Sequence, residues 1–351
     1  MTSRALLLVV AVLLIGPVLH VFGQGNADSL RTVAEHARDP QARFLALRQL
    51  SRTNDPILQA KYAAAAIRIG DSLLLHASGN DSLVRANLAP SYWNMGRSLS
   101  LRSNASDSIL RYYTHALEIW RGSKNRERVA FAQLHIGNLL LDRGQIGAAM
   151  DRYREAEDYY AQQRDSAQLA AIHGGMGHAY MDMGRYLKAI QHYSRSLELV
   201  PTDEPLTRGI TWNNLGLIYL YEGQQDTAMA CFKRSAEADL SGGDTLSALT
   251  PWNNMAKILS DQKRFDEAIG MLNKALRHVD EEAMPEQSAM LYNSLANVYT
   301  AMEDLPTAED RSKKAVSLAE EGHRPEILIS ARTTYTSVLM MQKRWHEAMR
   351  V

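Results

Sequence analysis

The histidines near the C-terminus and in the middle of the chain have the residue types for metal chemistry but not the spacing. His346-Glu347 begins like the H-E-x-x-H motif of zinc proteases, but Arg350 stands where the second histidine is required. His173 and His178 are five residues apart, which places them about 140° apart around a helix and makes them poor co-ligands. We therefore predict no metal site at these histidines.

Other catalytic patterns also fail. Gly175-x-Gly177 lacks the third glycine of a dinucleotide-binding loop and follows no predicted strand. Carboxylate pairs such as Glu281-Glu282 and Glu320-Glu321 lie at expected helix ends, where charged side chains are usually solvated. We predict that the protein is not an enzyme and that it has no cofactor and no catalytic residue.

Asparagines at regular spacing are the best candidates for a binding site. The first row of candidates is Asn213, Asn253 and Asn293, each directly after an aromatic residue. A second row lies four residues further along the same segments, at Arg97, Asn138, His178, Lys257 and Asn297. A planar amide has both a donor and an acceptor, so it can pair with the backbone of an extended peptide without reading its sequence.

An alternative explanation of the asparagines stays open. Asn can also bridge two neighbouring repeats, and Asn214 and Asn254 lie on a different face of the same helices. The two hypotheses are separated by replacing Asn213, Asn253 and Asn293 together with alanine and measuring binding.

The elements that carry these rows are repeats of about 40 residues. An apolar residue followed by Gly or Ala recurs, with the small residue at positions 96, 137, 177, 216, 256 and 296. Twelve residues later comes a second alanine, and four after that a bulky residue, as in Tyr153, Tyr193, Phe232 and Leu272, whereas Ser312 breaks the rule. Small residues allow two helices to approach closely, and the bulky residue fills the groove beside them. Each copy is therefore predicted to be a helix pair, with Asp226 and Asp266 capping helix starts.

The repeat resembles the tetratricopeptide repeat (TPR) family. The W-x2-L-G-x2-Y…A-x3-F pattern of that family is matched by Trp212, Leu215, Gly216, Tyr219, Ala228 and Phe232. The resemblance covers residues 41–351, but the step is about 40 residues where the family usually has about 34. The chain is thus similar to a longer-helix subclass found in bacterial peptide sensors and in sensor regions of bacterial regulators.

The resemblance implies an all-α fold, an α-α superhelix (TPR solenoid) of antiparallel helix pairs. It also implies that both rows line a concave groove, and that the asparagines hold a peptide backbone there. We predict a signal peptide over residues 1–23, a leading helix and degenerate repeat over 24–85, and the TPR array over 86–351, with six clear copies and an incomplete last one.

Charge and cysteine content narrow the possible partners. Lys plus Arg and Asp plus Glu both number 39, so the net charge is zero and gives no bulk attraction to nucleic acid. The single cysteine, Cys231, excludes an intramolecular disulfide. We predict a protein or peptide ligand and no nucleic acid.

The N-terminus is typical of export. An apolar run from Ala5 to Ile15 follows a short basic start, and small residues precede Gln24, which predicts cleavage after Gly23 and a periplasmic location. The alternative is an uncleaved anchor over residues 5–22 in the inner membrane, although Pro17 interrupts the run. A membrane association is expected only with such an anchor or if the chain continues.

The last copy begins near Ile327 and breaks off shortly after Ala348, within its expected second helix. Two functional hypotheses therefore stay open. The chain is a free protein- or peptide-binding scaffold, or it is the extracytoplasmic sensor region of a signalling receptor with a histidine kinase or helix-turn-helix output.

Overall fold

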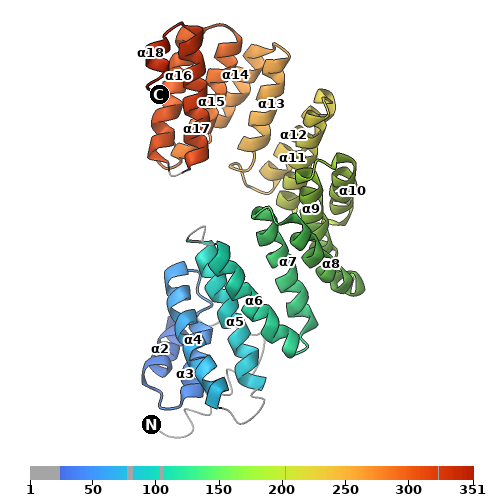
Figure 1. Cartoon of the computed structure of the whole chain (residues 1–351), viewed down its shortest axis with the longest axis vertical. Coiled ribbons are helices and arrows are strands. Elements are labelled where there is room, and N and C mark those ends of the chain that lie inside the picture. The colour runs from blue at the N-terminus through green and yellow to red at the C-terminus, as the bar shows by residue number, and fades with distance from the viewer. Residues whose placement is uncertain (1–23, 77–81, 103–105, 202, 323) are drawn as a thin grey trace. The chain divides into compact units, whose positions relative to one another are not determined.

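The computed structural model describes residues 24–76, 82–102, 106–201, 203–322 and 324–351 (Figure 1). The predicted signal peptide lies outside these residues and stays a prediction. Every regular element in the described ranges is a helix, so the predicted all-α fold of TPR helix pairs is confirmed. None of the described helices is both long and apolar enough to cross a membrane.

The chain divides into two compact units, residues 1–179 and 180–351. The first unit contains a leading helix, three consecutive helix pairs and most of a further helix. Its helices are α2 (Gln24–His36), α3 (Pro40–Leu50), α4 (Pro56–His76), α5 (Ser82–Ser100), α6 (Ser106–Gly122), α7 (Arg126–Asp142), α8 (Ile146–Gln163) and α9 (Ser166–Asp182), of which α9 runs across the boundary at Ala179. From α2 to α8 each helix packs on the next one in sequence. The expected leading helix and the degenerate repeat correspond to α2 and to the pair α3–α4.

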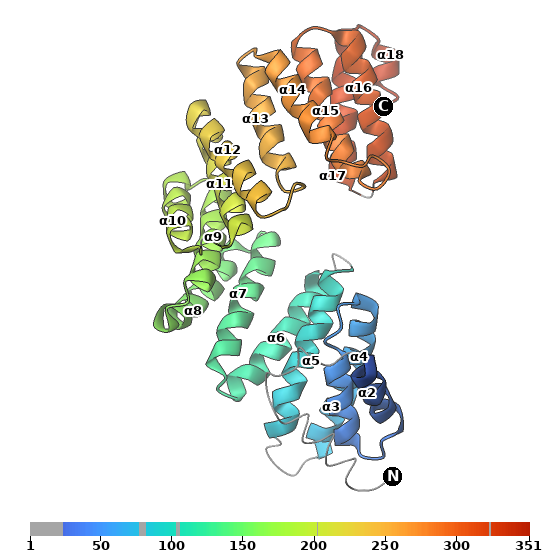
Figure 2. The same ribbon diagram turned by 180° about the vertical axis from the view of Figure 1, so that it is seen from behind.

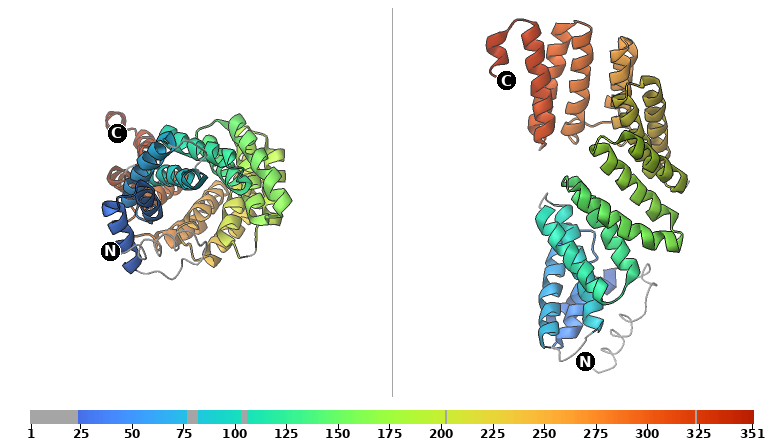
Figure 3. Two further views of the ribbon diagram at one scale, coloured as in Figure 1. Left: turned by 90° about the horizontal axis from the view of Figure 1, so that it is seen from below. Right: turned by 45° about the vertical axis from the view of Figure 1, so that its right-hand side comes forward.

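The second unit continues the same pattern of paired helices (Figure 2). Its helices are α10 (Tyr186–Leu199), α11 (Pro205–Tyr221), α12 (Gln225–Ser241), α13 (Leu249–Asp261), α14 (Phe265–Leu276), α15 (Pro285–Ala301), α16 (Leu305–Glu321), α17 (Pro325–Met341) and α18 (Trp345–Ala348). In this unit the first helix α15 contacts both of its neighbouring first helices, α13 and α17, so the three form a layer beside α14 and α16. The orange-to-red helices of this layer stand side by side in the right panel of Figure 3.

Where the small residue of a first helix is Gly137 or Gly216, it faces the bulky residue of the second helix. A Cβ atom added to Gly137 would lie 2.7 Å from the ring of Tyr153, and one added to Gly216 would lie 2.6 Å from the ring of Phe232. Both rings are fully buried. The predicted role of the small positions, which is to allow close approach of the paired helices, is therefore confirmed.

The tight turn inside each of the six helix pairs from α7–α8 to α17–α18 contains a left-handed residue. Gly144, Gly184 and Gly223 have φ between +67° and +75° at this position. In the next three repeats the same position is occupied by Lys263, Glu303 and Lys343, with φ of +60° to +64°. A residue with a Cβ adopts this conformation at some cost, so the last three turns are less favourable locally than the first three.

The predicted caps at Asp226 and Asp266 are wrong. The helices α12 and α14 begin one residue earlier, and the N-cap positions are Gln224 and Arg264, neither of which makes a side-chain cap bond. The two aspartates lie in the first turn, where a negative charge still interacts favourably with the positive end of the helix.

Candidate functional site

The two rows of candidate residues lie on the first helices of the repeats, as the sequence predicts. The first row stands on α11, α13 and α15 in the second unit. The second row is divided between the units, with Arg97, Asn138 and His178 in the first and Lys257 and Asn297 in the second. Each unit therefore has its own part of the second row.

Asparagines of the first row take part in bonds between neighbouring repeats. Asn254 Nδ2 donates to Asn213 Oδ1 at 3.2 Å, which joins α13 to α11. Asn293 Nδ2 donates to Ser330 Oγ at 3.2 Å, which joins α15 to α17. The bridging role that was the alternative explanation is thus present at two of the three first-row asparagines.

The remaining amide oxygens of this row are shielded. Oδ1 of Asn253 and Oδ1 of Asn293 are buried and have no hydrogen-bond partner among the described residues. A shielded oxygen cannot accept from the N–H of a ligand. Asn253 can therefore offer a peptide only its Nδ2 donor, and not the donor-and-acceptor pair that the sequence suggests. Asn213 keeps its Nδ2 donor and one further lone pair on the oxygen that accepts from Asn254.

The second row also uses its oxygens internally. The Tyr153 hydroxyl donates to Asn138 Oδ1 at 2.8 Å, and Thr334 Oγ1 donates to Asn297 Oδ1 at 3.3 Å. Both asparagines are exposed, and their Nδ2 groups make no hydrogen bond within the described part of the chain. The Asn138 amide is held by a ring that is itself wedged against Gly137 and Gly175.

Arg97 and Lys257 add positive charge to the second row. Arg97 on α5 and Lys257 on α13 are exposed, and His178 on α9 is half-buried. In each unit the row therefore presents guanidinium, ammonium or amide N–H groups at one position of successive repeats. Such a surface is suited to carbonyl and carboxylate oxygens.

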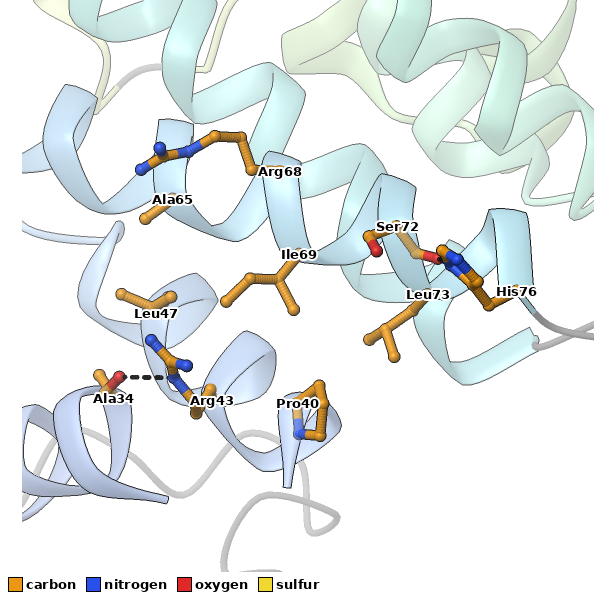
Figure 4. A pocket seen from close by; sticks show the side chains of 10 residues that line it. All are labelled: Ala34, Pro40, Arg43, Leu47, Ala65, Arg68, Ile69, Ser72, Leu73 and His76. Atoms are coloured by element: carbon orange, nitrogen blue, oxygen red, sulfur yellow. Dashed lines mark hydrogen bonds between the residues drawn. The ribbon is translucent and has the colours of Figure 1, made fainter. Parts of the chain in front are cut away.

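Two pockets in the first unit were not found from the sequence. The larger has a volume of about 680 Å³ and lies between α2, α3 and α4 (Figure 4). Its polar groups include Arg43, whose Nε donates to the Ala34 carbonyl at 3.1 Å, and His76, whose Nδ1 lies 2.7 Å from the Ser72 carbonyl. Both groups are thus engaged within the fold.

The second pocket has a volume of about 360 Å³ and lies between α3, α5 and α7. Three guanidinium groups line it, those of Arg48, Arg52 and Arg128. Aromatic rings form much of the remaining wall, namely Trp93, Trp120 and Phe131. We call this the arginine pocket. The sequence carries one signal for it, since Trp93 occupies the first-row position of the earliest clear repeat, but the three arginines follow no period.

The residues first considered for chemistry are not brought together. His173 Nε2 lies 3.7 Å from Glu157 Oε1 on the neighbouring helix, and His346 is exposed on α18. Glu347 forms an ion pair with Arg344 at 2.5 Å. Within the described residues no group of three His, Cys, Asp or Glu side chains is placed to hold a metal ion.

Cys231 is buried, and burial raises the pKa of its thiol, so it packs as an apolar residue.

The repeat geometry agrees with what comparison to known families finds. The family model of the MalT-like TPR region matches residues 175–351, which is half of the chain. The chain belongs to the MalT-like TPR family. The family model of the soluble NSF attachment protein, SNAP, matches residues 81–204. The resemblance to TPR proteins that the sequence suggested is therefore confirmed for both halves of this TPR chain.

A curated relative is the photosystem I assembly protein Ycf3 of Prochlorococcus marinus, which is 26% identical over 119 residues. The match spans 34% of this TPR chain and 64% of that protein, so less than two thirds of the relative is represented.

Solved structures show the same fold. The apo form of the quorum sensor NprR from B. thuringiensis has a TM-score of 0.64 at 16% identity, covering 92% of this chain and 89% of that one. A tetratricopeptide repeat protein from Parabacteroides merdae has a TM-score of 0.55 at 15% identity, covering 83% and 98%. At these identities the likeness concerns the fold alone.

Proposed function

We propose that the chain is a non-catalytic scaffold that binds a protein or peptide segment along its first helices. The observation that carries this proposal is the second row, where exposed N–H groups recur at one position of successive repeats. Asn138 and Arg97 provide them in the first unit, and Lys257 and Asn297 in the second. An extended segment has one carbonyl acceptor per residue, so it can meet such donors repeatedly without a defined sequence.

The framework supports binding with little loss of entropy. The donors stand on helices whose spacing is fixed by buried rings such as Tyr153 and Phe232. The Asn138 amide is oriented by Tyr153 and the Asn297 amide by Thr334 before any ligand arrives. Preorganised donors lower the ordering cost that a flexible surface has to meet on binding.

The test is an array of immobilised 15-residue peptides of random sequence, probed with the chain from Gln24 onward. The variants replace either Asn213, Asn253 and Asn293 together, or Lys257 and Asn297 together, with alanine. We expect both to retain their helical circular dichroism and to lose most of the peptide signal. A matched control replaces Asn273, an exposed asparagine on the second helix α14, and keeps the signal. Unchanged binding by folded row variants refutes the proposal.

We further infer that the chain is exported and is periplasmic after cleavage at Gly23. The support is the sequence of the first 23 residues, with a basic start, an apolar run and small residues before Gln24. Expression in a Gram-negative host, followed by mass measurement of the chain in the periplasmic fraction, tests this. A chain beginning at Gln24 is expected. An uncleaved chain in the membrane fraction supports the anchor over residues 5–22 instead.

A second candidate function is the extracytoplasmic sensor region of a signalling receptor. The observation that favours it is the likeness in fold to the quorum sensor NprR, which extends over 92% of this chain. Reading the gene beyond codon 351 separates the candidates. An in-frame apolar run of about 20 residues favours the receptor with a kinase or helix-turn-helix output, because that length spans a bilayer.

A further inference from the structure

The arginine pocket of the first unit concentrates positive charge without compensation. Arg48 is half-buried at the end of α3, Arg52 follows in the turn after it, and Arg128 stands in the first turn of α7. None of the residues that line the pocket is an aspartate or a glutamate. Among the described residues, these three guanidinium groups form no ion pair with a carboxylate within 4 Å. Three like charges around one cavity repel one another, and an anion would relieve this.

The pKa of Arg48 reflects the repulsion between these guanidinium groups. Burial, together with the charges of Arg52 and Arg128, lowers its pKa to about 10. An arginine is ordinarily protonated under all conditions, because its pKa is above 12. Every influence on Arg48 opposes its charge, which is the reverse of what an internal ion pair produces.

Arg48 also has unused hydrogen-bonding capacity. One of its terminal nitrogens donates to Gln49 Oε1 at 3.1 Å. Its Nε is buried and has no hydrogen-bond partner among the described residues. A guanidinium has five N–H donors, and leaving a buried one unpaired is unfavourable. Because this Nε is shielded from solvent, the groups that Arg48 can offer to a ligand in the pocket are its terminal N–H donors.

Beyond the three arginines and the polar side chains of Asn94 and Asn125, the wall of the pocket is apolar and largely aromatic. The Trp93 ring is stacked on Tyr113 at a centroid distance of 4.0 Å and lies 5.0 Å from the ring of Phe131. Trp120 lies 5.7 Å from Trp93, and Arg128 stands 5.9 Å above the centre of Phe131. A ligand that combines an anionic head with an apolar body would contact both parts of the pocket. The volume of about 360 Å³ is in the range of small-molecule sites.

Three guanidinium groups suit a divalent anion better than a monovalent one. A phosphate monoester has a charge of about −1.5 to −2 at pH 7 and three terminal oxygens, which can accept from several forked donors at once. A carboxylate has one charge and two oxygens in a plane. We propose that the arginine pocket binds a phosphoryl group attached to an apolar or aromatic body. This site is independent of the two rows and of the function proposed for them.

The probe for the test is phenyl phosphate, titrated calorimetrically into the full chain from Gln24. We expect it to bind at least tenfold more tightly than benzoate and than inorganic phosphate, since each of these lacks one part of the recognised group. A peptide with one phosphotyrosine distinguishes the source of the ligand. Tighter binding of this peptide than of phenyl phosphate points to a phosphorylated protein, and equal binding points to a small ester. Both results support the pocket.

Two variants make the test specific. Arg48→Gln removes the half-buried guanidinium, and Arg128→Gln removes an exposed one. Each is expected to weaken phenyl phosphate binding at least tenfold, and Arg128→Gln should also raise the thermal midpoint of the ligand-free chain because it removes repulsion. Arg154→Gln, on the exposed side of α8, is the matched control and leaves binding unchanged.

The proposal is overturned if benzoate binds as tightly as phenyl phosphate, or if folded Arg48→Gln and Arg128→Gln chains bind phenyl phosphate like the unmodified chain. Failure of phenyl phosphate to bind at all also overturns it. None of these results affects the peptide array, because its row variants lie in the second unit. Failure of this proposal is therefore distinguishable from failure of the proposed scaffold function.

Discussion

The amide of Asn254 on α13 donates a 3.2 Å hydrogen bond to the amide oxygen of Asn213 on α11, one repeat earlier in the chain. The bond joins the first helices of two successive repeats. It also limits how Asn213 can meet a ligand, because one of the two acceptor positions of its oxygen is used by Asn254. A candidate binding residue is thus oriented by a neighbour that the sequence placed on a different face.

Removal of this bond should weaken the second unit by a modest amount. Asn254→Ala is expected to lower the free energy of unfolding by about 1 kcal/mol, the usual contribution of one partly buried hydrogen bond. Urea unfolding of Asn213→Ala, Asn254→Ala and the double variant measures the coupling between the two residues. We expect about 0.5–1 kcal/mol of coupling. Additive effects of the single changes would mean that the bond contributes nothing.

The repeats could be predicted from the sequence because their rules are local. Gly216 and Phe232 recur with their equivalents at a fixed spacing, and each such pair forms one close helix contact. The rule tolerates an exception at Ser312, where a small residue stands in place of the bulky one. Ser312 is still buried, together with other residues of α16 such as Ala308 and Ala315. Where the pattern is weak, at α3 and α4, the helices were expected but their detailed contacts were not.

The candidate site could be predicted only in part. The position of the rows on the first helices follows from the repeat, but the partners of each amide do not. Asn213 and Asn293 bond to residues about 40 positions away, on helices whose relative rotation the sequence does not specify. The arginine pocket joins side chains of α3, α5 and α7 that share no period, so only the three-dimensional packing brings Arg48 and Arg128 together.

The close helix contact of each repeat predicts opposite effects for two glycine substitutions in the second unit. Gly216→Ala places a methyl group 2.6 Å from the fully buried Phe232 ring and should destabilise the chain by about 1–3 kcal/mol. Gly270→Ala, in α14, meets no atom within 4 Å and should stabilise it by up to about 1 kcal/mol through helix propensity. Thermal unfolding compares the two. Equal shifts in the same direction would contradict the contact argument.

The left-handed turns predict a stabilising change. Lys263 has φ of +60° and is exposed, at the position where Gly223 stands one repeat earlier. Lys263→Gly should raise the free energy of unfolding by about 0.5–1 kcal/mol, because glycine adopts this conformation without a steric penalty. The reciprocal change Gly223→Lys should lower it by a similar amount. Chemical denaturation of the two variants checks both signs, and a loss of stability in Lys263→Gly would refute the explanation.

A buried carboxylate on α12 makes the stability of the second unit depend on pH. Asp239 is 3% exposed, and Gly209 of α11 packs directly against it, since a Cβ at Gly209 would clash with its Oδ1. The pKa of Asp239 is raised to about 6, mainly by burial and further by the charge of Asp244, while the hydroxyl of Ser235 offsets part of the increase. In the unfolded chain an aspartate has a pKa of about 4.

The direction in which the free energy of unfolding changes with pH depends on whether the folded or the unfolded chain holds the proton of Asp239. Between about pH 4 and about pH 6 the folded chain binds this proton and the unfolded chain does not, so the free energy of unfolding decreases as the pH rises through this window. Asp239→Asn has no charge to bury. It should therefore equal the unmodified chain in stability near pH 4 and exceed it by about 2 kcal/mol at pH 7.5. Glu237→Gln, an exposed carboxylate on the same helix, is the control and should show no such window. Urea unfolding at pH 4, 5, 6 and 7.5 makes the measurement. A stability difference between Asp239→Asn and the unmodified chain that is the same at all four values would show that protonation of Asp239 is not its cause.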